Sequence, residues 1–226
     1  MNNYSYYLLV FEKPRIAAMT PTLNPRKAPL QARAKMTHDS IVEAAAQILG
    51  GRGLAGFNTN AVAARAGVSI GSLYQYFPNK DALMVALIHR QQTQQLDTLR
   101  SAVGAVIDTD LENVVRTLVR AAMQHHLDDS LLASAIDHEE ARLPIGEMLD
   151  GYLAHGGAMV VALLHRFKDD IGPINPEHAA RSLPALVRAT TDAWANLSPP
   201  RLDVAEDEAV RVVLGYLQTK PSAQLA

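Results

Sequence analysis

The sequence predicts an all-α protein with a small three-helix domain near its N-terminal end and a larger helical domain after it. After residue 30, apolar residues recur at spacings of three and four, which is the period of an amphipathic helix. No window shows the alternation and the turn pairs that mark β-hairpins. Proline and glycine clusters divide the pattern into separate helices. With 226 residues, 48% of them hydrophobic, the chain can form a substantial core.

Residues 1–30 are predicted to be a disordered tail, because prolines interrupt them repeatedly. The apolar patch at residues 6–11 is far too short to span a membrane, and the tail lacks the features of a secretory signal. Met19 is a candidate for the true start of the protein, as an alternative to Met1. Basic residues that can contact DNA, or can form a solvated tail, are Arg26, Lys27, Arg33 and Lys35.

The first helix of the small domain is expected to be capped by Thr37, with Asp39 near the positive end of the helix dipole. Its buried stripe is predicted to be Ile41, Ala44, Ala45, Ile48 and Leu49. Glycines at positions 50, 51 and 53 are expected to end it, and Phe57 to anchor the following loop in the small core.

Residues 59–80 predict two short helices joined by a tight turn. Thr59 is expected to cap the first, and Gly67 to end it in the left-handed conformation that glycine adopts readily. Ser69 is expected to cap the second helix, and the Pro-Asn pair at its end to start a long third one. This is the layout of a helix-turn-helix, whose second helix lies in the DNA major groove. The alternative is an ordinary αα-hairpin with solvated polar residues.

A long, position-specific pattern extends from Gln31 to Leu87. Its members are Ile41, Ala44, Ala45, Gly53, Phe57, Thr59, Val62, Ala63, Ala66, Gly67, Val68, Ser69, Gly71, Leu73, Tyr74, Tyr76, Phe77, Asn79, Lys80 and Leu83. The pattern resembles the DNA-binding domain of the TetR family of transcriptional regulators. The resemblance implies a helix-turn-helix DNA-binding domain at residues 31–88 and a helical effector-binding and dimerisation domain at residues 89–226.

The resemblance also divides the DNA-facing residues into two groups. Phosphate contacts are implied for Thr59, Tyr74, Tyr76 and Lys80. Candidates for contact with base edges are Asn60, Ile70, Gly71, Ser72 and Gln75, and Ser69 is also free to meet DNA. The ring of Tyr74 can instead belong to the core, with only its hydroxyl exposed. Gly71 has no side chain and would permit close approach of the backbone.

Charge is divided unevenly along the chain, although the formal net charge is only −2. Residues 26–80 carry a net charge of +5, and residues 81–226 carry a net charge of −8. A basic N-terminal part on an acidic body fits contact with phosphates by one end of the molecule. The absence of cysteine excludes disulfides and thiol chemistry, and it suits a cytoplasmic protein.

The long fourth helix, after the helix-turn-helix, is expected to run from Lys80 to about Leu99 or beyond, with the polar residues Arg90, Gln91, Gln92, Gln94 and Gln95 in solvent. Further helices are predicted at residues 110–127, 129–142, 145–168, 177–196 and 203–219.

The last two helices resemble the dimerisation pair of the family. Their apolar stripes are Ala180, Leu183, Leu186, Val187, Thr190 and Trp194, and Ala209, Val210, Val213, Leu214 and Leu217. The stripes can form an interface of four helices between two subunits, or they can pack on the chain's own core. Pro184 is expected to kink its helix or to delay its start.

An effector pocket is inferred from the architecture, because ligand sites in helical domains lie between helices. Its candidate lining residues are Met123, His126, Leu127, Met148, Tyr152, His155, Met159, Phe167 and Trp194. Plain core packing is the alternative for each. No cofactor, metal site or enzyme activity is predicted, since no two histidines are four residues apart and the HExxH, GxSxG and phosphate-loop motifs are absent.

The sequence therefore predicts a homodimeric, ligand-responsive repressor that binds a palindromic double-stranded DNA operator, takes an unidentified small-molecule effector and has no membrane partner. Two alternatives remain. One is a constitutive or activating DNA-binding regulator without an effector, and the other is a helical small-molecule carrier or enzyme.

Overall fold

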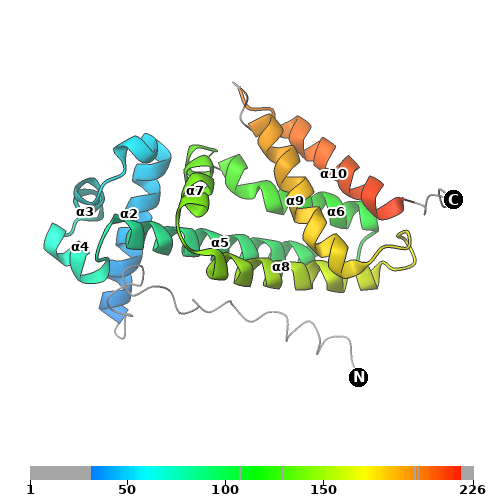
Figure 1. Cartoon of the computed structure of the whole chain (residues 1–226), viewed down its shortest axis with the longest axis horizontal. Coiled ribbons are helices and arrows are strands. Elements are labelled where there is room, and N and C mark those ends of the chain that lie inside the picture. Colours follow the sequence, from blue (N-terminus) through cyan, green and yellow to red (C-terminus); the bar gives the residue numbers. More distant parts are fainter. Residues whose placement is uncertain (1–31, 107, 129, 196, 198, 220–226) are drawn as a thin grey trace. The chain divides into compact units, whose positions relative to one another are not determined.

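The computed structural model describes residues 32–106, 108–128, 130–195, 197 and 199–219. Within these ranges the fold is all-α, as predicted, and contains no strand (Figure 1). The helices are α2 (Ala32–Gly56), α3 (Thr59–Ala66), α4 (Ile70–Tyr76), α5 (Lys80–Val106), α6 (Leu111–Asp128), α7 (Ser130–Arg142), α8 (Gly146–Arg166), α9 (Pro176–Ala195) and α10 (Leu202–Gln218). From α5 onward, the predicted helices are confirmed, with boundaries close to those expected. The predicted tail, residues 1–30, lies outside the described residues.

The helices group into two compact units. The N-terminal unit contains α2, α3, α4, residues 80–93 of α5, α7 and the start of α8 up to Leu149. The C-terminal unit contains α5 from Gln94, α6, α8 from Asp150, α9 and α10. The predicted boundary between a DNA-binding domain and an effector domain, at residues 88 and 89, differs from the boundary between these compact units. α7 comes after residue 89 in the chain but packs against α2. The assignment of the two functions to residues 31–88 and 89–226 stays a prediction.

The core of the N-terminal unit is built on the predicted face of α2. Ile41, Ala45 and Leu49 are fully buried, and Leu73 and Leu83 complete the core from α4 and α5. The whole predicted stripe of α2 is buried, and so is Phe57, so both predictions are confirmed. Apolar positions at helical spacing thus identify the packed face of α2 correctly.

The start of α2 differs from the prediction. The helix is already formed at Ala32, so Thr37 lies inside it and its hydroxyl donates to the carbonyl of Arg33 at 3.1 Å. The residues before Thr37 are mainly alanine and long-chain types, which favour helix strongly enough to extend it past the expected cap. Asp39 is therefore not in the first turn, and its predicted interaction with the helix end is also wrong.

The end of α2 depends on one glycine. The backbone is helical through Gly50 and Gly51, and the break comes at Gly53, with φ of 59° and ψ of −170°. Glycine has no Cβ and adopts this conformation without strain. Of the three glycines expected to terminate the helix, Gly53 alone leaves the helical conformation, and a final turn follows up to Gly56.

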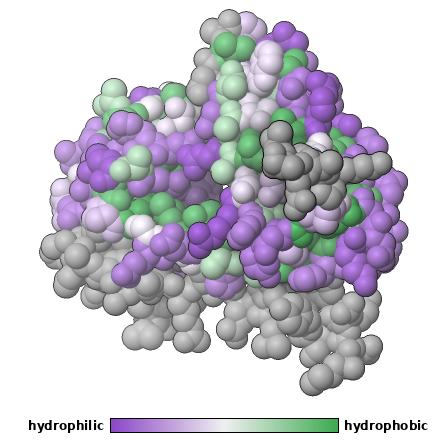
Figure 2. All heavy atoms as spheres, turned by 45° about the vertical axis from the view of Figure 1, so that its right-hand side comes forward, coloured by the Kyte–Doolittle hydropathy of each residue, from purple (hydrophilic) through white to green (hydrophobic). Residues whose placement is uncertain are grey.

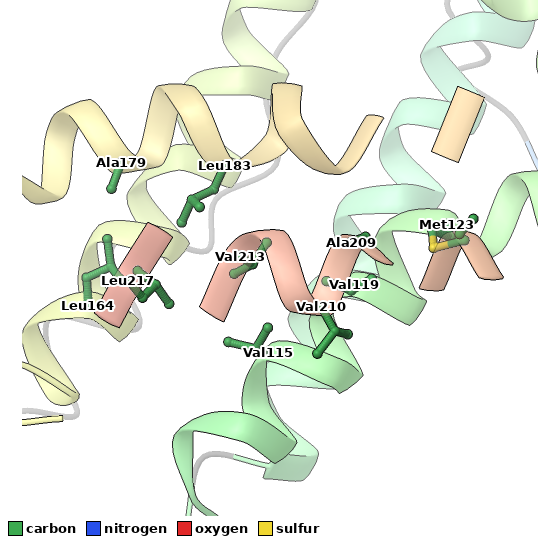
Figure 3. Close-up of a cluster of buried hydrophobic side chains, with 11 residues drawn as sticks. Val115, Val119, Met123, Leu164, Ala179, Leu183, Ala209, Val210, Val213 and Leu217 are labelled. Carbon is green, nitrogen blue, oxygen red and sulfur yellow. The ribbon is translucent and has the colours of Figure 1, made fainter. Parts of the chain in front are cut away.

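In the C-terminal unit, α10 lies between α6 and α9 (Figure 3). Its buried residues are Ala205, Ala209, Val210, Val213 and Leu217. They pack with Val115, Val119 and Met123 of α6, with Ala179 and Leu183 of α9, and with Leu164 of α8. For these α10 residues the alternative stated above holds: their stripe packs on the chain's own core.

The loop between α8 and α9 fixes the C-terminal end of α10. The amide of Gly172 donates to the carbonyl of Leu217 at 2.7 Å. A Cβ at position 172 would lie 2.5 Å from the carbonyl oxygen of Thr219, so only glycine fits this approach.

Pro184 does not delay the start of α9, because the helix begins at Pro176 and continues past it. Pro184 is exposed, and its ring removes the helical donor for the carbonyl of Ala180, one turn earlier. Among the described residues, no helix is long and apolar enough to cross a membrane.

Candidate nucleic-acid interface

The helices α3 and α4 are held by capping groups at their ends. Asn58 caps α3, because its side-chain oxygen accepts from the amide of Ala61 at 2.9 Å. The expected cap, Thr59, is instead the first helical residue. Both residue types are good N-caps, and the extended backbone of Asn58, with φ of −146°, decides between them.

The turn between α3 and α4 follows the prediction. Gly67 has φ of 68° and ends α3 with its amide directed at the carbonyls of the last turn. Ser69 caps α4, and its hydroxyl accepts from the amide of Ser72 at 3.0 Å. Asn79 caps α5 by accepting from the amide of Ala82 at 2.8 Å. These three predicted roles are confirmed.

One side of α4 is anchored in the core and the other faces solvent. Leu73 and the following Phe77 are fully buried. Ile70 is 38% exposed and Tyr74 is 41% exposed, although both are large and apolar or aromatic. Gln75 is exposed on the same helix. A helix of seven residues that keeps such side chains in solvent has a surface suited to contact with a partner.

All ten predicted DNA-facing residues lie in one stretch of the N-terminal unit and remain accessible. Those that are exposed are Asn60, Ser69, Ile70, Gly71, Tyr74, Gln75 and Lys80. Those that are half-buried are Thr59, Ser72 and Tyr76. The structure therefore brings these residues together, and their individual contacts with DNA stay a prediction.

Tyr74 links the two helices of the motif. Its hydroxyl lies 3.2 Å from the hydroxyl of Thr59, at the first position of α3. The exposure of Tyr74 excludes the alternative in which its ring belongs to the core. Two predicted phosphate contacts are thus placed side by side, one from each helix.

Two further side chains of this surface rest on aromatic rings. The Lys80 Nζ lies 5.3 Å from the centre of the Phe57 ring, which is within the range of a cation–π interaction. The ring of Tyr76 meets the imidazole of His38 edge to face, with 6.3 Å between ring centres. His38 also lies against Phe77 at 5.1 Å. Sequence reasoning missed His38, because its contacts come from a helix that is distant in the chain.

The Ser69 hydroxyl makes two contacts with Ser72 in the first turn of α4. Its hydroxyl oxygen accepts from the amide of Ser72 and also lies 2.8 Å from the Ser72 hydroxyl. The capping interactions therefore already engage the hydroxyl groups of Ser69 and Ser72, which leaves them fewer hydrogen-bonding positions for DNA.

The predicted effector residues are less uniform. Met123, Tyr152 and Met159 are buried in the C-terminal unit, and Met123 is part of the core around α10 (Figure 3). Half-buried Trp194 packs against that same core.

His155 is half-buried, and its Nδ1 lies 2.7 Å from the carbonyl oxygen of Gly151. Met148 is buried but belongs to the N-terminal unit. The side chains of His126 and Leu127 lie outside the described part of the chain. Among the residues whose side chains are described, no three His, Asp or Glu lie together in a way that could hold a metal ion.

Two protein-family models match this chain, each over a different part of the sequence. A family model described as "Bacterial regulatory proteins, tetR family" matches residues 41–87. A second one, described as "Tetracyclin repressor-like, C-terminal domain", matches residues 110–217. The first match contains α3 and α4, and the second contains most of α6 to α10.

Several regulators are similar over most of their length. The HTH-type transcriptional regulator Rv1255c of Mycobacterium tuberculosis is 29% identical over 178 residues, which are 79% of this chain and 83% of the relative. The HTH-type transcriptional repressor KstR of Mycolicibacterium smegmatis is 28% identical over 181 residues, 77% and 85% of the two chains. The solved structure of the fatty acid degradation regulator FadR from Bacillus halodurans has the same fold. It superposes with a TM-score of 0.64 at 24% identity, over 84% of this chain and 96% of that chain.

The matched family and these relatives are transcriptional regulators, not enzymes. One family model matches the helix-turn-helix and the other matches the helices that follow α5. The first match contains α4, which has a buried side at Leu73 and a side exposed to solvent. The chain therefore belongs to the TetR family and is a DNA-binding transcriptional regulator.

Proposed function

We propose that the chain is a ligand-responsive repressor that binds a palindromic operator as a homodimer. The observation that supports this most directly is the exposed side of α4, which presents Ile70, Tyr74 and Gln75 over a buried Leu73. A recognition helix in the major groove needs this combination of a fixed inner side and a polar or aromatic outer side. The similarity to KstR, which is named a repressor, supports the sign of regulation.

The DNA-facing residues have two roles in this proposal. Thr59, Tyr74, Tyr76 and Lys80 contact phosphates and hold the protein in place on the duplex. Asn60, Ile70, Gly71, Ser72 and Gln75 face base edges, where Asn and Gln can form paired hydrogen bonds with adenine. Ser69 contributes mainly as the cap of α4.

The proposed dimer uses the exposed sides of α9 and α10. Ala185, Ala189 and Ala193 are exposed at intervals of four along α9, and Gly215 is exposed on α10 with open space around it. Small residues allow the axes of facing helices to approach closely. In the upper part of Figure 2, where the C-terminal end of α9 lies, pale residues of weak hydropathy form a column among hydrophilic ones. The buried stripe of α10 then serves the subunit core and the exposed side serves the partner.

The proposed effector site lies in the C-terminal unit, which the Tetracyclin repressor-like model covers. Tyr152, His155 and Met159 follow one another at three- and four-residue intervals on α8, so they share one side of that helix. They combine a phenol, an imidazole and a flexible thioether, a lining that suits an apolar ligand with one or two polar groups. Binding there would release DNA if the effector binds more tightly to a state of the dimer in which the spacing of the two recognition helices does not match the spacing of the operator half-sites.

The proposal is tested by mobility shift of the purified chain on the DNA upstream of its own coding sequence, with excess competitor DNA present. A specific shift is expected. Lys80→Ala should weaken binding to all sequences and lower the salt slope by about one unit, whereas Gln75→Ala should change sequence preference. Lys168→Ala is the matched control, because Lys168 is an exposed lysine of the C-terminal unit. The absence of specific binding to any genomic fragment would contradict the proposal.

A further inference from the structure

Four polar side chains connect three helices of the N-terminal unit through hydrogen bonds. The Nε of Arg65, on α3, donates to Oε1 of Gln47, on α2, at 2.7 Å. The side-chain nitrogen of Gln47 donates to Oε1 of Glu43, one turn earlier on α2, at 2.9 Å. Nη1 of Arg90, on α5, donates to Oε2 of Glu43 at 2.8 Å. This series, Arg65–Gln47–Glu43–Arg90, is called the polar relay below.

The relay has a fixed direction of donation. The amide of Gln47 turns its oxygen to a cation and its nitrogen to a carboxylate, so a flipped amide would oppose like groups at both ends. The pKa of Glu43 is lowered from its usual 4.5, chiefly by the hydrogen bond from Gln47 and further by Arg90. Glu43 is therefore ionised at neutral pH and accepts at both oxygens, one bond from Gln47 of its own helix and one from Arg90 of α5.

The relay adds little to global stability. The side chain of Glu43 is 54% exposed, and exposed ion pairs contribute at most about 1 kcal/mol. Its effect is directional. α3 has eight residues and buries only Val62 and Ala63, so small side chains alone fix its rotation weakly. Directional hydrogen bonds from α2 limit that rotation.

We propose that Glu43 and Gln47 are positioning residues for DNA binding. They fix the orientation of α3 against α5, and the tight turn at Gly67 passes that orientation to α4. Neither residue contacts DNA in this arrangement. The proposal rests on the proposed function, in which α4 reads the operator.

The first test substitutes the central link. Gln47→Met keeps the length and charge of the side chain and removes both hydrogen bonds. Operator affinity is expected to fall about three- to tenfold. The salt slope of binding should be unchanged, because no phosphate contact is lost, and so should the thermal unfolding midpoint. Gln94→Met, at an exposed glutamine outside the relay, is the matched control and should bind as the wild-type chain does.

The second test asks whether the two ends of the relay act together. Arg65→Met removes the bond that reaches α3. Arg90→Met leaves that bond in place but removes the bond from α5 that holds Glu43, and through Glu43 the amide of Gln47. The double variant is therefore expected to bind about as well as the weaker single variant, whereas independent effects would multiply. Arg52→Met, at an exposed arginine of α2 outside the relay, corrects for the loss of one positive charge.

The outcomes separate the relay from the proposed function. A wild-type chain that binds no operator overturns the proposed function. Wild-type binding together with unaltered affinity of Gln47→Met, or with multiplying effects of the two arginine variants, overturns the relay alone. A fall in affinity of Gln47→Met accompanied by a reduced salt slope also overturns it, because Gln47 would then act on a phosphate contact.

Discussion

The short helix α4 and the long helix α10 are held in place by different means. α4 has seven residues, one buried side chain and a serine cap whose hydroxyl bonds the first turn. α10 has 17 residues and five buried side chains, and its N-cap residue, Arg201, makes no side-chain cap hydrogen bond. A helix of two turns depends on its caps, because nucleation is costly, whereas a long helix is stabilised by its packed side. The helix that we propose to contact DNA is thus fixed by local chemistry, and the helix in the core of the C-terminal unit by distant contacts.

The largest expected effect is on α10. Leu217→Ala should lower the free energy of unfolding by about 2–5 kcal/mol, because it removes a fully buried side chain and leaves a cavity. Denaturant unfolding followed by the fluorescence of Trp194, which packs against the same core, measures it. A loss below about 1 kcal/mol would show that α10 is not held by packing.

The next effect concerns the contact of Gly172 with the C-terminal end of α10, described above and called the Gly172 clamp here. Gly172→Ala places a Cβ against the backbone of Thr219 and is expected to cost about 1–3 kcal/mol, by the same Trp194 measurement. Gly104→Ala is the control, because Gly104 is helical, has open space around it and should become slightly more stable. Equal free energies of unfolding of the two variants would show that the Gly172 clamp does not help to hold α10 in place.

A smaller effect is expected for the cap of α4. Ser69→Ala should destabilise α4 by about 1 kcal/mol, because the amide of Ser72 loses its acceptor. Hydrogen exchange of the amides at residues 70–76 should accelerate, while exchange in α10 stays the same. Ser69→Asp keeps an acceptor and should preserve protection. Unchanged exchange in Ser69→Ala would mean that α4 is held by Leu73 and Phe77 alone.

The smallest expected effect is a pH dependence confined to the N-terminal unit. Burial, and secondarily the charge of His38, lowers the pKa of His89 from its usual 6.5. The folded state therefore binds this proton more weakly than the unfolded state does. The contribution of His89 is fully present above pH 6.5 and is lost as the pH falls below 6.5 through the lower pKa of the folded state. The protection factors of the α5 amides at residues 82–88, compared between pH 7.5 and pH 5.5, measure this loss of stability. In His89→Gln the protection factors should differ less between the two pH values than in the wild-type chain.

The sequence predicts the helix-turn-helix well because its determinants are local. Gly67, Ser69 and Asn79 act on backbone groups within four residues of themselves, so residue type and spacing suffice to assign them. The error at Thr59 has a local origin too, since Asn58 beside it has a comparable preference for the cap and backbone conformation decides. At Thr37 the helix-favouring residues before it extend the helix past the expected cap. The boundaries of α6 to α10 were also predictable, because proline, glycine and aspartate mark them.

Contacts between distant helices were not predictable from the pattern. Arg90, Gln92 and Gln95 looked solvated at the sequence level, yet Arg90 bonds Glu43, Gln92 bonds Glu140, and Gln95 bonds backbone carbonyls of α6. A polar residue on a helix face can face water or a polar partner, and spacing does not distinguish the two. The same limit applies to the effector residues, where a buried methionine such as Met123 fits a pocket or a core equally well by composition.

The single helix α5 has a mechanical consequence. It is continuous from Lys80 to Val106, and 27 residues at 1.5 Å each make a rod about 40 Å long. A tilt of about 5° around one end of such a lever displaces the other end by about 3 Å, close to the 3.4 Å rise per nucleotide along the axis of a DNA duplex. Small angular changes in α5 are therefore sufficient to move Lys80 by one nucleotide step.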